Sequence, residues 1–115
     1  MVVRCWQEDL CTVLRLCGDL DVTSAPRLRA ELEPVLSTPG PLRLVLDLTE
    51  VPFCDSVGLG VLVSTLNHAR RTGGRLILVL QEGMISHLLT ITNLDHHFET
   101  SPSLADAQAA LSTAA

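Results

Sequence analysis

The stretch from 51 to 63, VPFCDSVGLGVLV, contains the residue types best suited to do chemistry. Asp55 and Ser56 stand at the start of an amphipathic segment, and Gly58 follows two residues later. A serine in the first turn of a helix lies beside free backbone N–H groups and the positive end of the helix dipole. An oxygen anion on Ser56 would be tolerated there. Gly58 and Gly60 carry no Cβ, so this turn stays open to close approach by another molecule.

Three kinds of chemistry fit this pattern. In the first, Asp55 or Ser56 only caps the helix. In the second, Ser56 is a nucleophile on a strand-to-helix turn, but that motif needs Gly two residues before the serine, where Cys54 stands. The histidines that could serve as a base, none of them directed at Ser56 by its spacing, are His68, His87, His96 and His97. In the third, Ser56 is phosphorylated, and the added negative charge beside Asp55 repels a partner docked on the turn.

The elements that must position this segment alternate between strand and helix patterns. The expected strands cover the ranges 2–7, 11–17, 42–48, 75–81 and 96–100. The expected helices begin at Thr23 or Ser24, near 57, near Met84 and at Ser103. Pro34 should bend or end the first helix, Gly73 should terminate the second, and Asp106 should complete a capping box in the last.

This order predicts an α/β fold formed by one domain over residues 1–115. The first two strands form a hairpin, which makes the sheet mixed, and the chain as a whole builds a mostly parallel sheet of about five strands covered by about four helices. Function in such sheets tends to lie in loops at the carboxyl ends of strands. The loops that qualify are 18–24 and 51–58.

Composition narrows the classes of partner. The formal net charge is −5, and the eight basic residues are scattered arginines without any lysine, which disfavours nucleic acid and anionic membranes as partners. The longest apolar runs are too short to cross a bilayer, and Glu8 and Asp9 interrupt what would be a signal peptide. We therefore expect a soluble, cytoplasmic protein.

The cysteines and histidines suggest no cofactor chemistry. No Cys-x-x-Cys spacing occurs, and the expectation for Cys5, Cys11, Cys17 and Cys54 is that all are buried as small apolar residues. His96 and His97 lack a third ligand at a suitable spacing, so no metal site is expected. The third helix is expected to face the core with Met84, Ile85, Leu88 and Leu89, with the alternative that part of this helix borders the surface on which a partner docks.

The segment FCDSVGLGVLV closely resembles the signature of the anti-sigma factor antagonists of the STAS domain family. GDLDVTSAP at 18–26 resembles the family's segment before the first helix, and LRLVLDLTEVPFCDS resembles the strand that leads to the switch serine. The Gly73-Gly74 pair with RLILVL matches the family's next strand. The resemblance extends over the whole chain, and the two motifs at this spacing are specific together.

The resemblance implies a non-enzymatic partner switch. The unphosphorylated form would bind an anti-sigma factor that is also a serine kinase, and so release a sigma factor. Phosphorylation of Ser56 would dissociate the complex, and a phosphatase would reset it. ATP and magnesium would be bound by the kinase, so this chain needs no cofactor. The residues that this resemblance assigns to partner binding are Asp21, Thr23, Asp55, Ser56, Val57, Gly58 and Leu59.

Val57 departs from the family pattern, because many members have a second Ser or Thr there. Ser56 is thereby the only hydroxyl in the turn. The same fold also serves in scaffolds and transport complexes. The alternative function is therefore a constitutive scaffold or transport-complex subunit in which Ser56 is only a helix cap.

Overall fold

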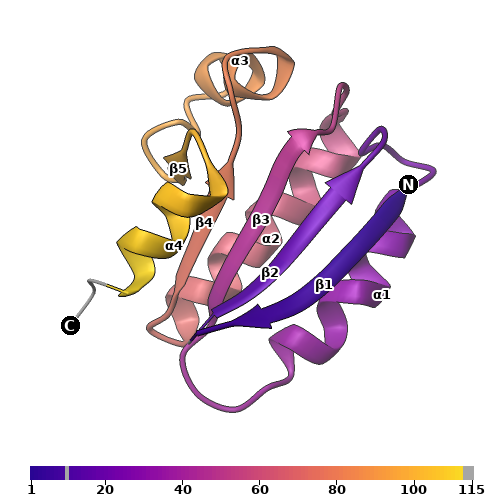
Figure 1. Ribbon diagram of the computed structural model, residues 1–115. Coiled ribbons are helices and arrows are strands. Elements are labelled where there is room, and N and C mark those ends of the chain that lie inside the picture. The colour runs from indigo at the N-terminus through magenta and orange to yellow at the C-terminus, as the bar shows by residue number, and fades with distance from the viewer. Residues whose placement is uncertain (10, 113–115) are drawn as a thin grey trace.

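The computed structural model describes residues 1–9 and 11–112, which form five strands and four helices in the expected order (Figure 1). The strands are β1 Val2–Glu8, β2 Cys11–Cys17, β3 Arg43–Glu50, β4 Arg75–Val79 and β5 Glu99–Ser101. The helices are α1 Ala25–Leu36, α2 Ser56–Arg71, α3 Met84–Ile91 and α4 Leu104–Ser112. No helix in the described ranges is both long and apolar enough to span a bilayer.

The sheet has the strand order β1-β2-β3-β4-β5. β1 pairs antiparallel with β2, and the pairs β2–β3, β3–β4 and β4–β5 are parallel. The expected mixed, mostly parallel sheet is therefore confirmed. β3 lies at its centre and is buried on both faces from Leu44 to Leu48, a segment in which every residue except Asp47 is apolar.

Helices cover both faces of the sheet. α1 and α2 lie behind the sheet in the view of Figure 1, and α3 stands at the end of the sheet where β2 and β3 finish. α4 lies in front of β4 and contacts β3, β4 and β5. The leucines of alternate strand positions form the larger core under α1 and α2. A smaller apolar cluster, which includes Val13, Val45 and Ile77, packs against Ala107 and Leu111 of α4.

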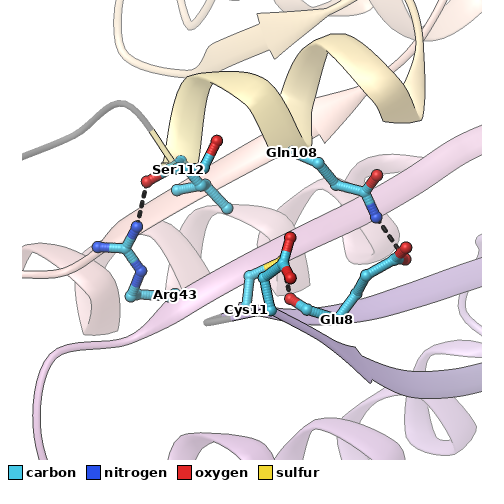
Figure 2. A pocket seen from close by; sticks show the side chains of 7 residues that line it. Glu8, Cys11, Arg43, Gln108 and Ser112 are labelled. Carbon is cyan, nitrogen blue, oxygen red and sulfur yellow. Dashed lines mark hydrogen bonds between the residues drawn. The ribbon is translucent and has the colours of Figure 1, made fainter.

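Polar contacts hold α4 against the edge of the β1–β2 hairpin. Figure 2 shows Gln108 donating a hydrogen bond to the Glu8 carboxylate and the Arg43 guanidinium donating to the carbonyl oxygen of Leu111. The Cys11 thiol donates to the Glu8 carbonyl at 3.2 Å. Burial, together with the Glu8 charge, raises the pKa of Cys11. These contacts fasten the last helix at the end of the sheet opposite to the loops that follow β2 and β3.

The expectation that all four cysteines are buried is wrong for two of them. Cys11 and Cys54 are buried, whereas Cys5 and Cys17 are exposed. Cys5 lies on β1, which is an edge strand, and Cys17 ends β2 beyond the part of the sheet that helices cover. Strand alternation in the sequence does not tell an edge strand from a central one, which explains Cys5, and it does not show which end of a strand the helices leave uncovered, which explains Cys17.

The helix starts and the last strand need small corrections. Ser24 occupies the N-cap position of α1, but its side chain does not cap the helix, and Thr23 does not either. The Asp21 carboxylate instead accepts hydrogen bonds from the amides of Thr23 and Ser24. Pro34 lies two residues before the end of α1, close to where the sequence places a stop. β5 begins at Glu99 and not at residue 96.

Candidate functional site

The loops that follow β2 and β3 lie side by side at one end of the sheet. Leu20 and Cys54 form a parallel bridge: the Leu20 amide donates to the Phe53 carbonyl at 2.9 Å, and the Asp55 amide donates to the Leu20 carbonyl at 3.1 Å. Parallel strands bring their carboxyl ends to the same edge, so segments more than thirty residues apart in the sequence meet there. The two loops singled out from the sequence therefore form one surface.

The Asp55 carboxylate fixes this surface from both sides. One oxygen accepts the Gly58 amide at 2.9 Å and so caps α2, and the other accepts the Val22 amide at 3.0 Å. The backbone hydrogen bond from Gly58, followed by that from Val22, holds the pKa of Asp55 below its ordinary value. Asp55 thus connects the start of α2 to the loop after β2.

Gly58 lies in the tightest contact between these segments. A Cβ built at this position would stand 2.4 Å from the Leu20 carbonyl oxygen and 2.8 Å from its Cγ. A Cβ at Gly60 would meet no atom within 4 Å. The first of the two glycines is therefore required by packing, and the second is not.

Ser56 is the first residue of α2, and its side chain is exposed. Within residues 1–9 and 11–112 its hydroxyl has no hydrogen-bond partner, and no histidine contacts it. The cap is Asp55, so the hypothesis that Ser56 serves as a helix cap is wrong. Its hydroxyl is free to react with an external group.

The predicted site residues differ in exposure. Val57 is exposed, Leu59 is half-buried against the core, and Gly58 is buried. Thr23 is exposed in the neighbouring loop, and Asp21 is half-buried with its carboxylate engaged by backbone amides of that loop. Asp55, Ser56, Val57 and Gly58 are thus brought together directly, while Asp21 and Thr23 join them through the loop that Asp55 holds.

Sequence reasoning named Val57 but missed the other apolar residues of this surface. Val22, Phe53, Val57 and Met84 are 63%, 44%, 40% and 40% exposed, and we call these four residues the apolar rim. The sulfur of Met84, at the start of α3, accepts the Cys54 amide at 3.3 Å, which places α3 against the loop. Met84 was expected to face the core and does not. Apolar residues inside loops of turn-forming composition are the signal that could have revealed Val22 and Phe53.

The charge around the apolar rim is negative. The segments 18–24, 51–60 and 80–87 contain four carboxylates and no arginine, and the carboxylates belong to Asp19, Asp21, Asp55 and Glu82. Burial raises the pKa of the neighbouring Cys54 thiol to about 11, with the Asp55 charge adding to the effect, so this thiol stays protonated at neutral pH. The surface is thus apolar and acidic, and it includes the free hydroxyl of Ser56.

Because Asp55 caps α2 and Ser56 does not, substitutions of the two residues should affect stability differently. Asp55→Ala should lower the urea midpoint of unfolding, because two backbone amides lose their acceptor. Ser56→Ala should leave the midpoint unchanged, because no bond is lost. Unfolding can be followed by the fluorescence of Trp6, which is the chain's single tryptophan. Equal losses in both variants would restore a capping role to Ser56.

Comparison with known proteins identifies the class. A family model described as the STAS domain matches residues 5–107. The chain therefore belongs to the STAS domain family, as the motifs around Ser56 indicate.

Similar proteins within this class include anti-sigma factor antagonists. The anti-sigma-B factor antagonist of Bacillus subtilis (strain 168) is 37% identical over 81 residues, which make up 70% of this chain and 72% of that protein. The crystal structure of an anti-sigma factor antagonist from Mycobacterium paratuberculosis is similar with a TM-score of 0.85 and 28% identity, covering 96% of this chain and 93% of that one. The Bacillus cell fate determinant SpoIIAA in its phosphorylated form shares the fold, with a TM-score of 0.73, 17% identity and coverage of 96% and 99%.

Proposed function

We propose that this chain is an anti-sigma factor antagonist whose binding is switched off by phosphorylation of Ser56. The unphosphorylated form binds an anti-sigma factor that is also a serine kinase, and binding releases a sigma factor. The kinase supplies ATP and magnesium, this chain performs no catalysis, and a phosphatase restores the free hydroxyl. We place this cycle in the cytoplasm, without nucleic acid or membrane as a partner of this chain.

The observation that carries the proposal is the free Ser56 hydroxyl among the residues of the apolar rim. Segments that contribute the rim are bonded to the residues flanking Ser56: the Val22 amide to Asp55, and the Met84 sulfur to the Cys54 amide. A partner that covers this rim necessarily covers the hydroxyl. The same contact that gives affinity thus presents Ser56 to the partner, as a kinase that is also the binding partner requires.

Phosphorylation would act on the complex more strongly than on the free chain. A phosphate adds about −1.5 to −2 charges at neutral pH. In the free chain the amides of the first turn of α2 and the helix dipole accommodate this charge. In the complex the charge must be desolvated within an apolar contact, on a surface that already has four carboxylates. The complex loses affinity while the antagonist stays folded.

The test is a pull-down from the native host with Ser56→Ala and Ser56→Asp baits, read by mass spectrometry. The Ala bait should retain an anti-sigma factor kinase, and the Asp bait should lose it. Ser64→Asp is the matched control, because it places the same charge on an exposed position of α2 about 12 Å further along the helix. It should behave as the wild type.

Phosphorylation itself is tested with the captured partner. Incubation with ATP and magnesium should add one phosphate to the wild type and none to Ser56→Ala. Identical sets of bound proteins on the Ala and Asp baits would count against the switch and favour the constitutive scaffold or transport-complex subunit.

A further inference from the structure

The β1–β2 hairpin leaves one sheet face open on the side where α4 lies. α4 packs on β3, β4 and β5, and Figure 1 shows the outer part of the sheet in front of α1 without a helix over it. Arg4 and Arg15 are direct cross-strand partners on this face. Side chains at such positions have Cβ atoms about 4.5–5.5 Å apart, and like charges directly opposite each other are unfavourable. The register therefore sets two arginine side chains opposite each other, an arrangement that an opposite charge stabilises.

Arg15 is held in a fixed position. Its Nε donates to the Asp47 carboxylate at 3.0 Å, and its guanidinium carbon lies 5.3 Å from the centre of the Trp6 ring. Asp47 is 3% exposed, and its second oxygen accepts the amide and the hydroxyl of Thr49. The terminal nitrogens of Arg15 have no acceptor in the part of the chain that the structure describes. The hydrogen bond from Nε thus fixes the orientation of the Arg15 guanidinium, and the two terminal nitrogens remain free to donate.

Arg4 adds a second guanidinium group to this face of the sheet. Among the described residues it has neither an ion pair nor a side-chain hydrogen bond, and its side chain is exposed. The two arginines line a hollow of about 350 Å³ together with Val2, Cys17 and Glu50. Glu50 faces the same hollow without lying within ion-pair distance of either arginine in the described structure.

We propose that this hollow, which we call the arginine hollow, binds the phosphate or carboxylate group of a small anionic ligand. Free guanidinium nitrogens match both oxyanions through charge-assisted, bidentate hydrogen bonds. An anion also relieves the repulsion between the cross-strand arginines. A buried carboxylate and an aromatic ring orient Arg15 in advance, so less entropy is lost on binding. Neither Asp47 nor Trp6 belongs to the surface around Ser56.

Trp6 is a built-in reporter, because the chain has one tryptophan and no tyrosine. The experiment titrates the full chain with inorganic phosphate, and in a separate arm with malonate, at an ionic strength kept constant with chloride. Trp6 fluorescence and the backbone NMR shifts of β1 and β2 are recorded together. We expect saturable changes confined to the residues around Arg4 and Arg15, and the arm with the tighter binding identifies the class of oxyanion.

Substitutions of two residues that line the arginine hollow should change the affinity for the oxyanion in opposite directions. Arg4→Gln should abolish saturation, because one of the two guanidinium groups is lost. Glu50→Gln should bind several-fold more tightly, about fivefold for the removal of one unit of repulsion at close range in water. Both side chains are exposed, so the fold is retained. Arg27→Gln, which removes one charge from the exposed Arg27–Glu31 pair on α1, should bind like the wild type.

Two results would overturn the proposal. One is a wild type that gives no saturable change in either fluorescence or NMR shifts. The other is an affinity that Arg4→Gln and Arg27→Gln lower equally, because this would show a response to overall charge and not to a site.

Discussion

Gly58→Ala is expected to destabilise the protein by about 2 to 3 kcal/mol, as overpacking of a tight contact does. The added Cβ would stand 2.4 Å from the Leu20 carbonyl oxygen, which is a backbone atom fixed by its hydrogen bond with the Asp55 amide. Relief therefore requires the loop 18–24 to move away from α2. The bond between Asp55 and the Val22 amide would be strained by the same movement, so capture of the partner should weaken as well.

Gly60→Ala is the matched control, and its expected effect has the opposite sign. Position 60 is exposed in α2, and its Cβ would meet nothing within 4 Å. Replacing a glycine inside a helix by alanine gains about 0.5 to 1 kcal/mol. Urea unfolding of both variants measures the difference. A Gly58→Ala variant as stable as Gly60→Ala would show that the two loops are not held at the distance the structure describes.

The order of elements was accessible from the sequence because local signals determine it. Alternating apolar residues in 42–48, helical spacing from Leu59 to Leu66 and the Gly73 terminator lie in the places where the structure has β3, α2 and its end. Phe98 shows where this reasoning fails. The sequence places it in a strand, but it is buried in the turn before β5, where its amide donates to the Leu94 carbonyl. Apolar content alone does not distinguish a strand from a loop that packs on the core.

Only the local part of the candidate site could be predicted from the sequence. Asp55, Ser56 and Gly58 are neighbours in the chain, and the cap geometry follows from their spacing. The contact between Leu20 and Gly58 is nonlocal, and so is the placement of Met84 beside Cys54. These contacts depend on the strand order and on how tightly the loops pack, which no periodicity expresses. Most of the apolar rim therefore came from the structure, whereas Ser56 was singled out from the sequence.

The largest electrostatic effect on stability is expected at the Arg15–Asp47 pair. Arg15→Leu leaves the Asp47 carboxylate, whose side chain is 4% exposed, without its cation. Breaking a buried pair by removal of one partner costs about 3 kcal/mol or more. The partial exposure of Arg15 favours the lower end of this range, because water already solvates part of the pair. By contrast, Glu31→Gln breaks an exposed pair with Arg27 and should cost less than about 1 kcal/mol.

The pH dependence gives this prediction a signature that lost packing would not produce. Burial raises the pKa of Asp47, but the hydrogen bonds from Thr49 and the contact with Arg15 outweigh burial, and the pKa lies below its ordinary value. A lowered pKa means that this contribution to stability is present above the unfolded-state pKa of about 3.9 and is lost as the pH falls through the folded-state pKa. The difference in the free energy of unfolding between wild type and Arg15→Leu should therefore shrink from pH 7 to pH 3. A difference of the same size at both pH values would mean that Arg15 stabilises the sheet through its packing on Trp6 and not through its charge.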